Sequence, residues 1–117
     1  MPRYNGSCHC GAVTFSFEAE AIVDAMRCSC SICRRKGAAL STFTLPPEAL
    51  EIAAEDGRLS TYRFGTQTAK HHFCNRCGIF PFVETRLTPG HYRVNLGCLD
   101  DLDSFALPVT VFDGTAI

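Results

Sequence analysis

The cysteines of this chain are gathered into three short clusters, and this grouping constrains the fold more than any other feature of the sequence. Seven of the eight cysteines lie in the motifs Cys8-x-Cys10, Cys28-x-Cys30-x-x-Cys33 and Cys74-x-x-Cys77. A zinc ion bound for structure takes four protein ligands, whereas a catalytic zinc takes three and leaves one position open. The clusters therefore predict two Zn²⁺ ions per chain, one fully enclosed and one with an open position.

Nothing in the sequence points to export or to a membrane. The first residues, MPRYNGSCHC, lack the basic region and following apolar stretch of a secretory signal. No apolar run approaches the roughly 18 residues that are needed to cross a bilayer. We therefore expect a cytoplasmic protein with no membrane partner. Because thiols stay reduced in the cytosol, the clustered cysteines indicate metal ligands rather than disulfides.

The charge of the chain disfavours nucleic acid as a partner. Its formal net charge is −1; four thiolates on one Zn²⁺ contribute −2 and three on another contribute −1, which brings the holo chain to −4. Proteins that bind nucleic acid usually present a basic surface. The basic run Arg34-Arg35-Lys36 adjoins the second cysteine cluster. It fits a solvated charged segment and a contact for an anionic substrate equally well.

Apolar and polar residues alternate in a way that predicts one mainly β domain over residues 1–117. Val13, Phe15 and Phe17 alternate with polar residues, as in a half-buried strand over 12–18. No stretch of ten or more residues carries a helical apolar stripe. Further strands are predicted at 22–27, 38–45, 50–53, 59–64, 70–73, 79–84, 92–96 and 109–112.

Proline and glycine predict how some of these strands begin and connect. Pro46-Pro47 ends the strand at 38–45 and precedes a single helical turn at 48–50. Glu55-Asp56-Gly57 predicts a hairpin between the strands at 50–53 and 59–64. Pro81 indicates that the strand at 79–84 lies at an edge or contains a bulge.

Glycines also suggest how the cysteine clusters pair. Gly11 follows Cys10 and Gly78 follows Cys77, and glycine allows the positive φ with which the chain can turn beneath a metal. Residues two apart share one face of a strand, so the first pair of cysteines can reach one ion. The C-x-x-C knuckle can direct backbone amides to its sulfurs. These features indicate one four-sulfur site with the ligands Cys8, Cys10, Cys74 and Cys77. A different pairing of the clusters is geometrically conceivable.

The middle cluster supplies three sulfurs within six residues. Cys28, Cys30 and Cys33 would fill three corners of a zinc tetrahedron, with water or a substrate thiol at the fourth. A thiol bound to zinc loses its proton and becomes a nucleophile at neutral pH. The adjacent cations Arg34 and Arg35 would hold an anionic small molecule that carries the thiol.

Three further residues bear on this site. Cys98 ends an apolar strand and is interpreted as a buried small apolar residue; as a fourth ligand it would close the open site. His71 and His72 alternate faces, so at most one can point towards a site. Both are interpreted as surface histidines.

Three ordered motifs resemble those of the glutathione-dependent formaldehyde-activating enzyme family, which shares its domain with centromere protein V. They are Gly6-Ser-Cys-His-Cys-Gly11, Cys28-Ser-Cys-Ser-Ile-Cys-Arg-Arg-Lys-Gly37 and Phe73-Cys-Asn-Arg-Cys-Gly78. The resemblance extends over residues 4–114. It implies an Mss4-like fold of small coiled antiparallel sheets around a zinc-ribbon-like core. It also implies a structural zinc on the four-cysteine set and a catalytic zinc on Cys28, Cys30 and Cys33.

The reaction of that family is the addition of glutathione to formaldehyde, which gives S-hydroxymethylglutathione and is formally a carbon–sulfur lyase reaction in reverse. The resemblance thus implies an enzyme with a thiol and an aldehyde as substrates. Because this chain is more compact than the formaldehyde-activating members, we expect the fold and metal sites to carry over, but not the identity of the substrates. The alternative hypothesis is a non-catalytic two-zinc module that binds a thiol ligand or a protein partner. Thiol redox chemistry ranks last, because Cys98 has no cationic neighbour in the sequence.

Overall fold

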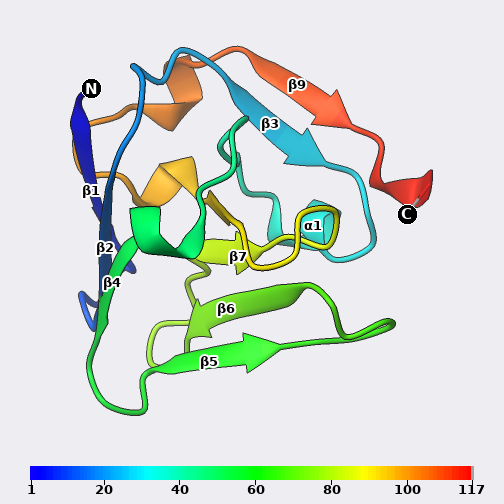
Figure 1. The fold of residues 1–117 in the computed structure, drawn as a ribbon, viewed down its shortest axis with the longest axis horizontal. Helices are drawn as coiled ribbons and strands as arrows, with labels where there is room; N and C mark the ends of the chain where they lie inside the picture. Colours follow the sequence, from blue (N-terminus) through cyan, green and yellow to red (C-terminus); the bar gives the residue numbers. More distant parts are fainter. Residues whose placement is uncertain (117) are drawn as a thin grey trace.

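The computed structural model describes residues 1–116 and is mainly β, as the sequence predicts (Figure 1). Helix α1 has four residues, and the other helical segments are single 3₁₀ turns; none of the described helices is long and apolar enough to span a membrane. The elements in chain order are β1 (Arg3–Ser7), β2 (Val13–Glu18), β3 (Ala25–Cys28), α1 (Cys33–Lys36), η1 (Pro47–Ala49), β4 (Glu51–Ala54), β5 (Leu59–Tyr62), β6 (Lys70–Cys74), β7 (Phe82–Glu84), β8 (Tyr92–Val94), η2 (Leu96–Cys98), η3 (Ser104–Ala106), β9 (Val109–Phe112) and η4 (Gly114–Ala116).

The strands form three small sheets. One sheet has the order β1-β2-β4, a second has the order β5-β6-β7-β8, and β3 pairs with β9. The first two sheets are antiparallel throughout. In Figure 1 the first sheet stands at the left, β5 and β6 lie at the bottom, and β3 with β9 cross the top.

The core lies between the first two sheets. Val13, Phe15 and Phe17 are buried, as the alternation in the sequence predicts. Phe15 of β2 meets Phe82 of β7 edge to face, with ring centroids 5.6 Å apart. Gly6 of β1 makes room for this contact, because a Cβ atom there would lie 2.5 Å from the ring of Phe15. The aromatic contact therefore fixes the two sheets against each other.

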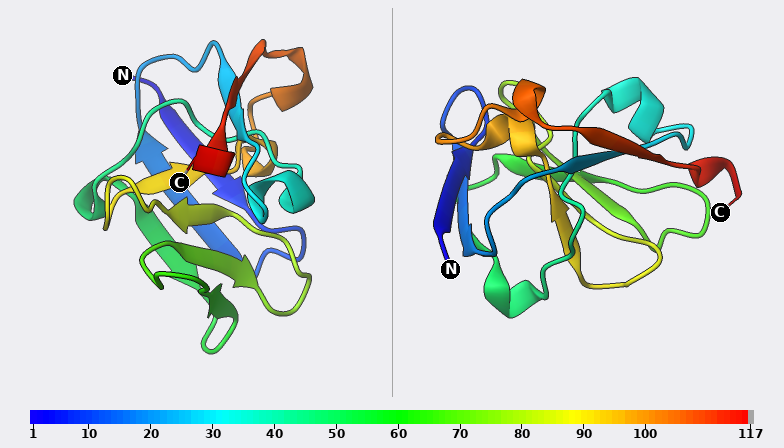
Figure 2. Two further views of the ribbon diagram at one scale, coloured as in Figure 1. Left: turned by 90° about the vertical axis from the view of Figure 1, so that its right-hand side faces the viewer. Right: turned by 90° about the horizontal axis from the view of Figure 1, so that it is seen from above.

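The pairing of β3 with β9 differs from the all-antiparallel arrangement that was expected. These two strands run parallel, with Ala25 opposite Val109 and Cys28 opposite Phe112, and they lie side by side in the views of Figures 1 and 2. A parallel pair needs a long crossover connection. Here the crossover contains β4 to β8, so it could not be recognised as a local pattern.

The predicted strand at 38–45 is wrong. Leu40 forms isolated bridges to Met26 and Asn95, and Leu45 forms one to Tyr92. Between these bridges the hydroxyl of Ser41 donates to the carbonyl of Phe43 at 2.8 Å, which bends the chain away from an extended ladder. The segment therefore joins β3 to β8 without belonging to either sheet.

The predicted hairpin between 50–53 and 59–64 is also wrong, although both strands exist as β4 and β5. β4 pairs with β2, and β5 pairs with β6. The turn at Gly57 does occur, with φ of 75°, but it carries the chain from one sheet to the next. Turn residues indicate a change of direction and do not identify the partner of a strand.

The segment around Pro81 shows a further difference. Pro81 lies just before β7, which is an interior strand between β6 and β8 rather than an edge. Its carbonyl accepts from the amide of Asn95 at 2.8 Å. Strand β7 thus begins only after the proline, at Phe82, and it is not an edge strand. The predicted turn at 48–50 is confirmed as η1, Pro47–Ala49.

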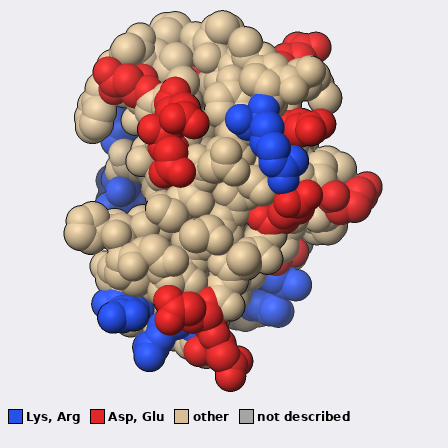
Figure 3. All heavy atoms as spheres, turned by 90° about the vertical axis from the view of Figure 1, so that its left-hand side faces the viewer, with Lys and Arg blue, Asp and Glu red and all other residues tan. Residues whose placement is uncertain are grey.

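The outer face of the sheet β1-β2-β4 carries charges of both signs. Figure 3 shows acidic and basic side chains interspersed on this face. Arg3 of β1 pairs with Glu51 of β4 at 2.6 Å, with both side chains exposed. The face therefore lacks the continuous basic stripe with which proteins usually bind nucleic acid.

Candidate metal centres and cavity

The four-cysteine group is assembled at one end of the core from two separate connections. Cys8 and Cys10 lie in the turn between β1 and β2, Cys74 ends β6, and Cys77 lies in the turn before β7. Their sulfur atoms all lie within 4.8 Å of one another, and the pairs Cys8–Cys10 and Cys10–Cys74 are each 3.7 Å apart. Zn–S bonds of about 2.3 Å place the sulfurs of a tetrahedron about 3.8 Å apart. The group therefore fits a tetrahedral metal ion.

Backbone amides support these sulfurs, as the knuckle motif predicts. The amide of Val13 donates to Sγ of Cys8 at 3.3 Å. The backbone NH of Ile79 stabilises the Cys77 thiolate and is the main reason that the pKa of Cys77 falls to about 6. Gly11 and Gly78 have the expected positive φ, 83° and 80°. The Ile79 amide thus favours the thiolate form of Cys77.

The predicted way in which the first two cysteines converge is wrong. Cys8 and Cys10 do not converge by sharing the face of a strand, because β1 ends at Ser7. A tight turn brings them together instead, in which the amide of Gly11 donates to the carbonyl of Cys8 at 3.3 Å.

The three-cysteine group lies where β3 passes into α1. Cys28 is the last residue of β3, Cys30 lies in the following turn, and Cys33 begins α1. Their sulfurs lie within 4.8 Å of one another, and within residues 1–116 no other cysteine, histidine or carboxylate joins them. Burial raises the pKa of Cys33. A metal ion would displace the thiol protons on binding, and the group could supply three sulfur ligands to it.

The segment after β9 covers this group. The amide of Ser29 donates to the carbonyl of Phe112 at 3.0 Å, and the amide of Gly114 donates to the hydroxyl of Ser29 at 3.1 Å. A Cβ atom on Gly114 would lie 2.6 Å from both Sγ of Cys28 and Cβ of Cys30. Only a residue without a side chain fits this contact as it stands, and no local pattern of residues predicts it.

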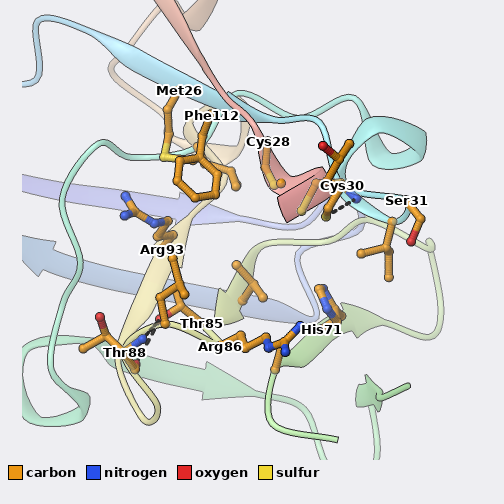
Figure 4. Close-up of a pocket in the computed structure, with 18 of the residues that line it drawn as sticks. Met26, Cys28, Cys30, Ser31, His71, Thr85, Arg86, Thr88, Arg93 and Phe112 are labelled. Carbon is orange, nitrogen blue, oxygen red and sulfur yellow. Dashed lines mark hydrogen bonds between the residues drawn. The ribbon is translucent and has the colours of Figure 1, made fainter. Parts of the chain in front are cut away.

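A cavity of about 400 Å³ opens beside the three-cysteine group (Figure 4). All three of these cysteines line it, whereas the four-cysteine group does not. Its charged lining residues are Arg86 and Arg93, and no carboxylate from the described residues lines it. Arg93 is fixed by a hydrogen bond of 2.8 Å from its guanidinium to the carbonyl of Ser41. Much of the wall is apolar, formed by Met26, Ile32, Leu40, Phe64, Val83, Leu87 and Phe112.

A buried histidine also borders the cavity, which corrects the interpretation of both histidines as surface residues. His71 of β6 is 5% exposed and lines the cavity. Its Nδ1 lies 2.7 Å from Nζ of Lys36, which in turn lies 3.7 Å from the ring centre of Phe80. Burial, followed by the charge of Lys36, lowers the pKa of His71 to about 4, and burial lowers the pKa of Lys36 to about 8.

His72 faces the other way. Its Nε2 lies 2.7 Å from the carboxylate of Glu84, and its Nδ1 lies 2.9 Å from the hydroxyl of Thr61. The expectation that at most one of the two histidines faces a site agrees with this arrangement.

The arginines that the sequence offered as substrate contacts lie elsewhere. Arg34 and Arg35 are exposed on α1, and neither lines the cavity. The guanidinium of Arg35 donates to the carbonyl of Ser31 at 2.6 Å. Their contact with substrate stays a prediction, whereas Arg86 and Arg93, which sequence reasoning missed, do line the cavity.

Cys98 does not join the three-cysteine group. It lies in η2, with its sulfur 3.9 Å from the carbonyl of Phe80, near Cys8 and Cys77 of the four-cysteine group. Burial raises the pKa of Cys98 to about 11. The interpretation of Cys98 as a small apolar residue rather than a fourth ligand is consistent with this position.

Comparison with known proteins places the fold and the cysteine motifs in one family. The model of the glutathione-dependent formaldehyde-activating enzyme family matches residues 3–114. A crystal structure of a Rhodobacter sphaeroides protein, a structural genomics target, is 39% identical and superposes with a TM-score of 0.79. That match covers 91% of this chain and 99% of the other. Because the family match extends over nearly the whole sequence, this chain belongs to the glutathione-dependent formaldehyde-activating enzyme family.

Proposed function

We propose that this protein is a zinc-dependent enzyme of the carbon–sulfur lyase type, which adds glutathione or a similar thiol to formaldehyde or another small aldehyde. One observation carries the proposal: three sulfurs with no fourth ligand from residues 1–116 border a cavity, whereas the four-sulfur group lies outside it. In this proposal Cys28, Cys30 and Cys33 hold a catalytic zinc. The structural zinc is held by Cys8, Cys10, Cys74 and Cys77.

The residues around the cavity suit an anionic thiol. A zinc ion on the three thiolates would offer its open position to a substrate sulfur and would favour the thiolate form of that sulfur. Arg86 and Arg93 supply positive charge that no lining carboxylate of the described chain neutralises. Guanidinium groups bind carboxylates through paired hydrogen bonds, so these two arginines would bind and orient the carboxylates of a molecule such as glutathione.

The addition itself needs no oxidant or reductant. The thiolate sulfur attacks the aldehyde carbon, a C–S bond forms, and the π electron pair of the C=O bond moves to oxygen. The oxygen then takes up one proton, which balances the proton that the thiol released. A largely apolar wall limits the water around the reactants, which strengthens the electrostatic interactions of the cavity with them.

We expect loss of one sulfur from the three-cysteine group to abolish catalysis and leave the fold intact. Exchange NMR of ¹³C-formaldehyde and glutathione at neutral pH measures the rate of adduct formation and decay. Wild-type protein should accelerate the exchange, and Cys30→Ser should lose more than about 100-fold of that acceleration. Cys98→Ser, which alters a cysteine outside both groups, should keep it. No acceleration by wild-type protein would refute this pair of substrates.

The apolar wall predicts that aliphatic aldehydes are also substrates. Each buried methylene contributes about 0.8 kcal/mol, so binding should improve by roughly four-fold per methylene from acetaldehyde to butanal. The measurement is kcat/KM for each aldehyde at a fixed thiol concentration. A steady fall in kcat/KM along the series would contradict the prediction and favour an enzyme restricted to formaldehyde.

The alternative, a non-catalytic two-zinc module that binds a thiol ligand or a protein partner, would gain support if both metal sites were closed by protein ligands, for instance by Cys98 at the second site. Because Cys98 lies beside the four-cysteine group, no specific observation favours that alternative. We propose a cytoplasmic location, because reduced thiols are required at both groups.

A further inference from the structure

His71 is a buried titratable residue that the proposed reaction has not yet used. It belongs to β6, is 5% exposed, and lines the cavity together with the three-cysteine group. Figure 4 shows its ring on the cavity side, below Cys30. Phe64 stacks on the ring with centroids 5.7 Å apart. The imidazole is therefore held in one orientation at the wall of the cavity.

The contact with Lys36 determines which ring nitrogen carries the proton. Nζ of Lys36 lies 2.7 Å from Nδ1 of His71 and is held over the ring of Phe80. An ammonium group can only donate hydrogen bonds, so Nδ1 must accept. A neutral imidazole then carries its hydrogen on Nε2. Lys36 is thus a positioning residue for the tautomer of His71.

The Nε2 atom is left to face the cavity. Within residues 1–116, the one hydrogen-bond contact of the His71 ring is the contact at Nδ1, and no buried side-chain nitrogen or oxygen lacks a partner. Nε2 must therefore be accessible, and the accessible side of this buried ring is the cavity that it lines. His71 is also not a member of the three-sulfur group, so its N–H is free to bind a substrate.

We infer that His71 donates a hydrogen bond from Nε2–H to the aldehyde oxygen and stabilises the negative charge that develops there. This inference rests on the proposed function. When the C–S bond forms, the π electron pair of the C=O bond moves to oxygen, and the Nε2–H group binds the resulting alkoxide. The alkoxide then takes its proton from water, and His71 keeps its own. A fixed donor in a largely apolar cavity stabilises such an oxyanion strongly.

Kinetics of His71 variants test the donor. His71→Ala should lower kcat for thiol addition by on the order of 10²-fold, the usual effect of removing one oxyanion donor, with little change in KM for the thiol. His71→Gln can place an amide N–H near the position of Nε2 and should recover part of the loss. His91→Ala alters a histidine that does not line the cavity and serves as the control. Metal content and melting temperature are measured for every variant.

NMR of the imidazole nitrogens tests the arrangement without any substrate. Long-range ¹H–¹⁵N correlations at neutral pH should show His71 as the Nε2–H tautomer in the zinc-loaded protein. Lys36→Met removes the donor to Nδ1 and should allow the other tautomer to appear, whereas Lys36→Arg should preserve the Nε2–H form. His72, which is held by Glu84 and Thr61, should not change.

The outcomes separate this inference from the proposed function. If wild-type protein catalyses the addition and His71→Ala does so at the same kcat, the inference is overturned and the function stands. An Nδ1–H tautomer in wild-type protein also overturns it. If wild-type protein does not accelerate the addition at all, the proposed function fails, and the role of His71 fails with it.

Discussion

Replacing Cys74 by serine is expected to unfold most of the domain at room temperature. Cys74 is fully buried at the end of β6, and its sulfur lies 3.7 Å from that of Cys10, 64 residues away in sequence. Zinc bound at such a site contributes about 10 kcal/mol or more to folding in small zinc peptides. The whole stability of a small domain is about 5–15 kcal/mol, so loss of this site removes a comparable amount. Circular dichroism during heating and elemental analysis measure the result.

Two further variants show whether the effect is specific to the four-cysteine group. Cys30→Ser alters the group beside the cavity and should retain cooperative unfolding with one equivalent of zinc. Cys98→Ser should retain both equivalents, because Cys98 belongs to neither group. A Cys74→Ser protein that melts at the wild-type temperature would show that the four-cysteine group does not support the fold.

The second large effect is expected for Gly114→Ala. The added Cβ atom would lie 2.6 Å from Sγ of Cys28 and 2.7 Å from the backbone nitrogen of Cys30, closer than atoms can pack. Overpacking of this kind costs about 1–3 kcal/mol, and the strain falls on Cys28 and Cys30 of the three-cysteine group. We expect the variant to keep the zinc of the four-cysteine group and to lose the other zinc, together with catalysis. Elemental analysis and the exchange assay measure both effects.

Val111→Ala is the matched control for this variant. Val111 belongs to the adjacent strand β9 and is 67% exposed, so its truncation should leave both metals and the activity unchanged. Gly114→Ala with two equivalents of zinc and wild-type activity would mean that the segment after β9 can move away from the cysteines without consequence.

The two cysteine groups could be predicted from the short spacing between cysteines in the sequence. C-x-C and C-x-x-C spacings bring sulfurs together through the turns in which they lie, and the Cys-Gly endings indicated which clusters pair. The alternation of Val13, Phe15 and Phe17 likewise predicted β2 correctly, because one face of that strand is buried. The pairing of strands could not be predicted in this way. β4 and β5 flank a good turn at Gly57 and still join different sheets.

The cavity could not be predicted from the sequence either, because distant segments form it. Its wall combines His71 of β6, Arg86 after β7, Arg93 of β8 and Gly114 after β9, and no local pattern links them. His71 and His72 are neighbours in sequence, and which of the two is buried depends on the face of β6 that the rest of the chain covers. Arg34 and Arg35 are adjacent to the cysteines in sequence, but on the short helix α1 they are exposed and do not line the cavity.

The parallel pairing of β3 with β9 also sets an order for assembly during synthesis. A ribosome that has made Cys77 has supplied every sulfur of the four-cysteine group. The partner of Cys28, Phe112, follows Cys28 by 84 positions, and Gly114 comes later still. The four-cysteine group can therefore assemble early in synthesis. The thiols of the three-cysteine group stay uncovered until the segment after β9 has been made. A chain without the segment after β9 would hold every sulfur of both groups but would lack the residue that packs against Cys28 and Cys30.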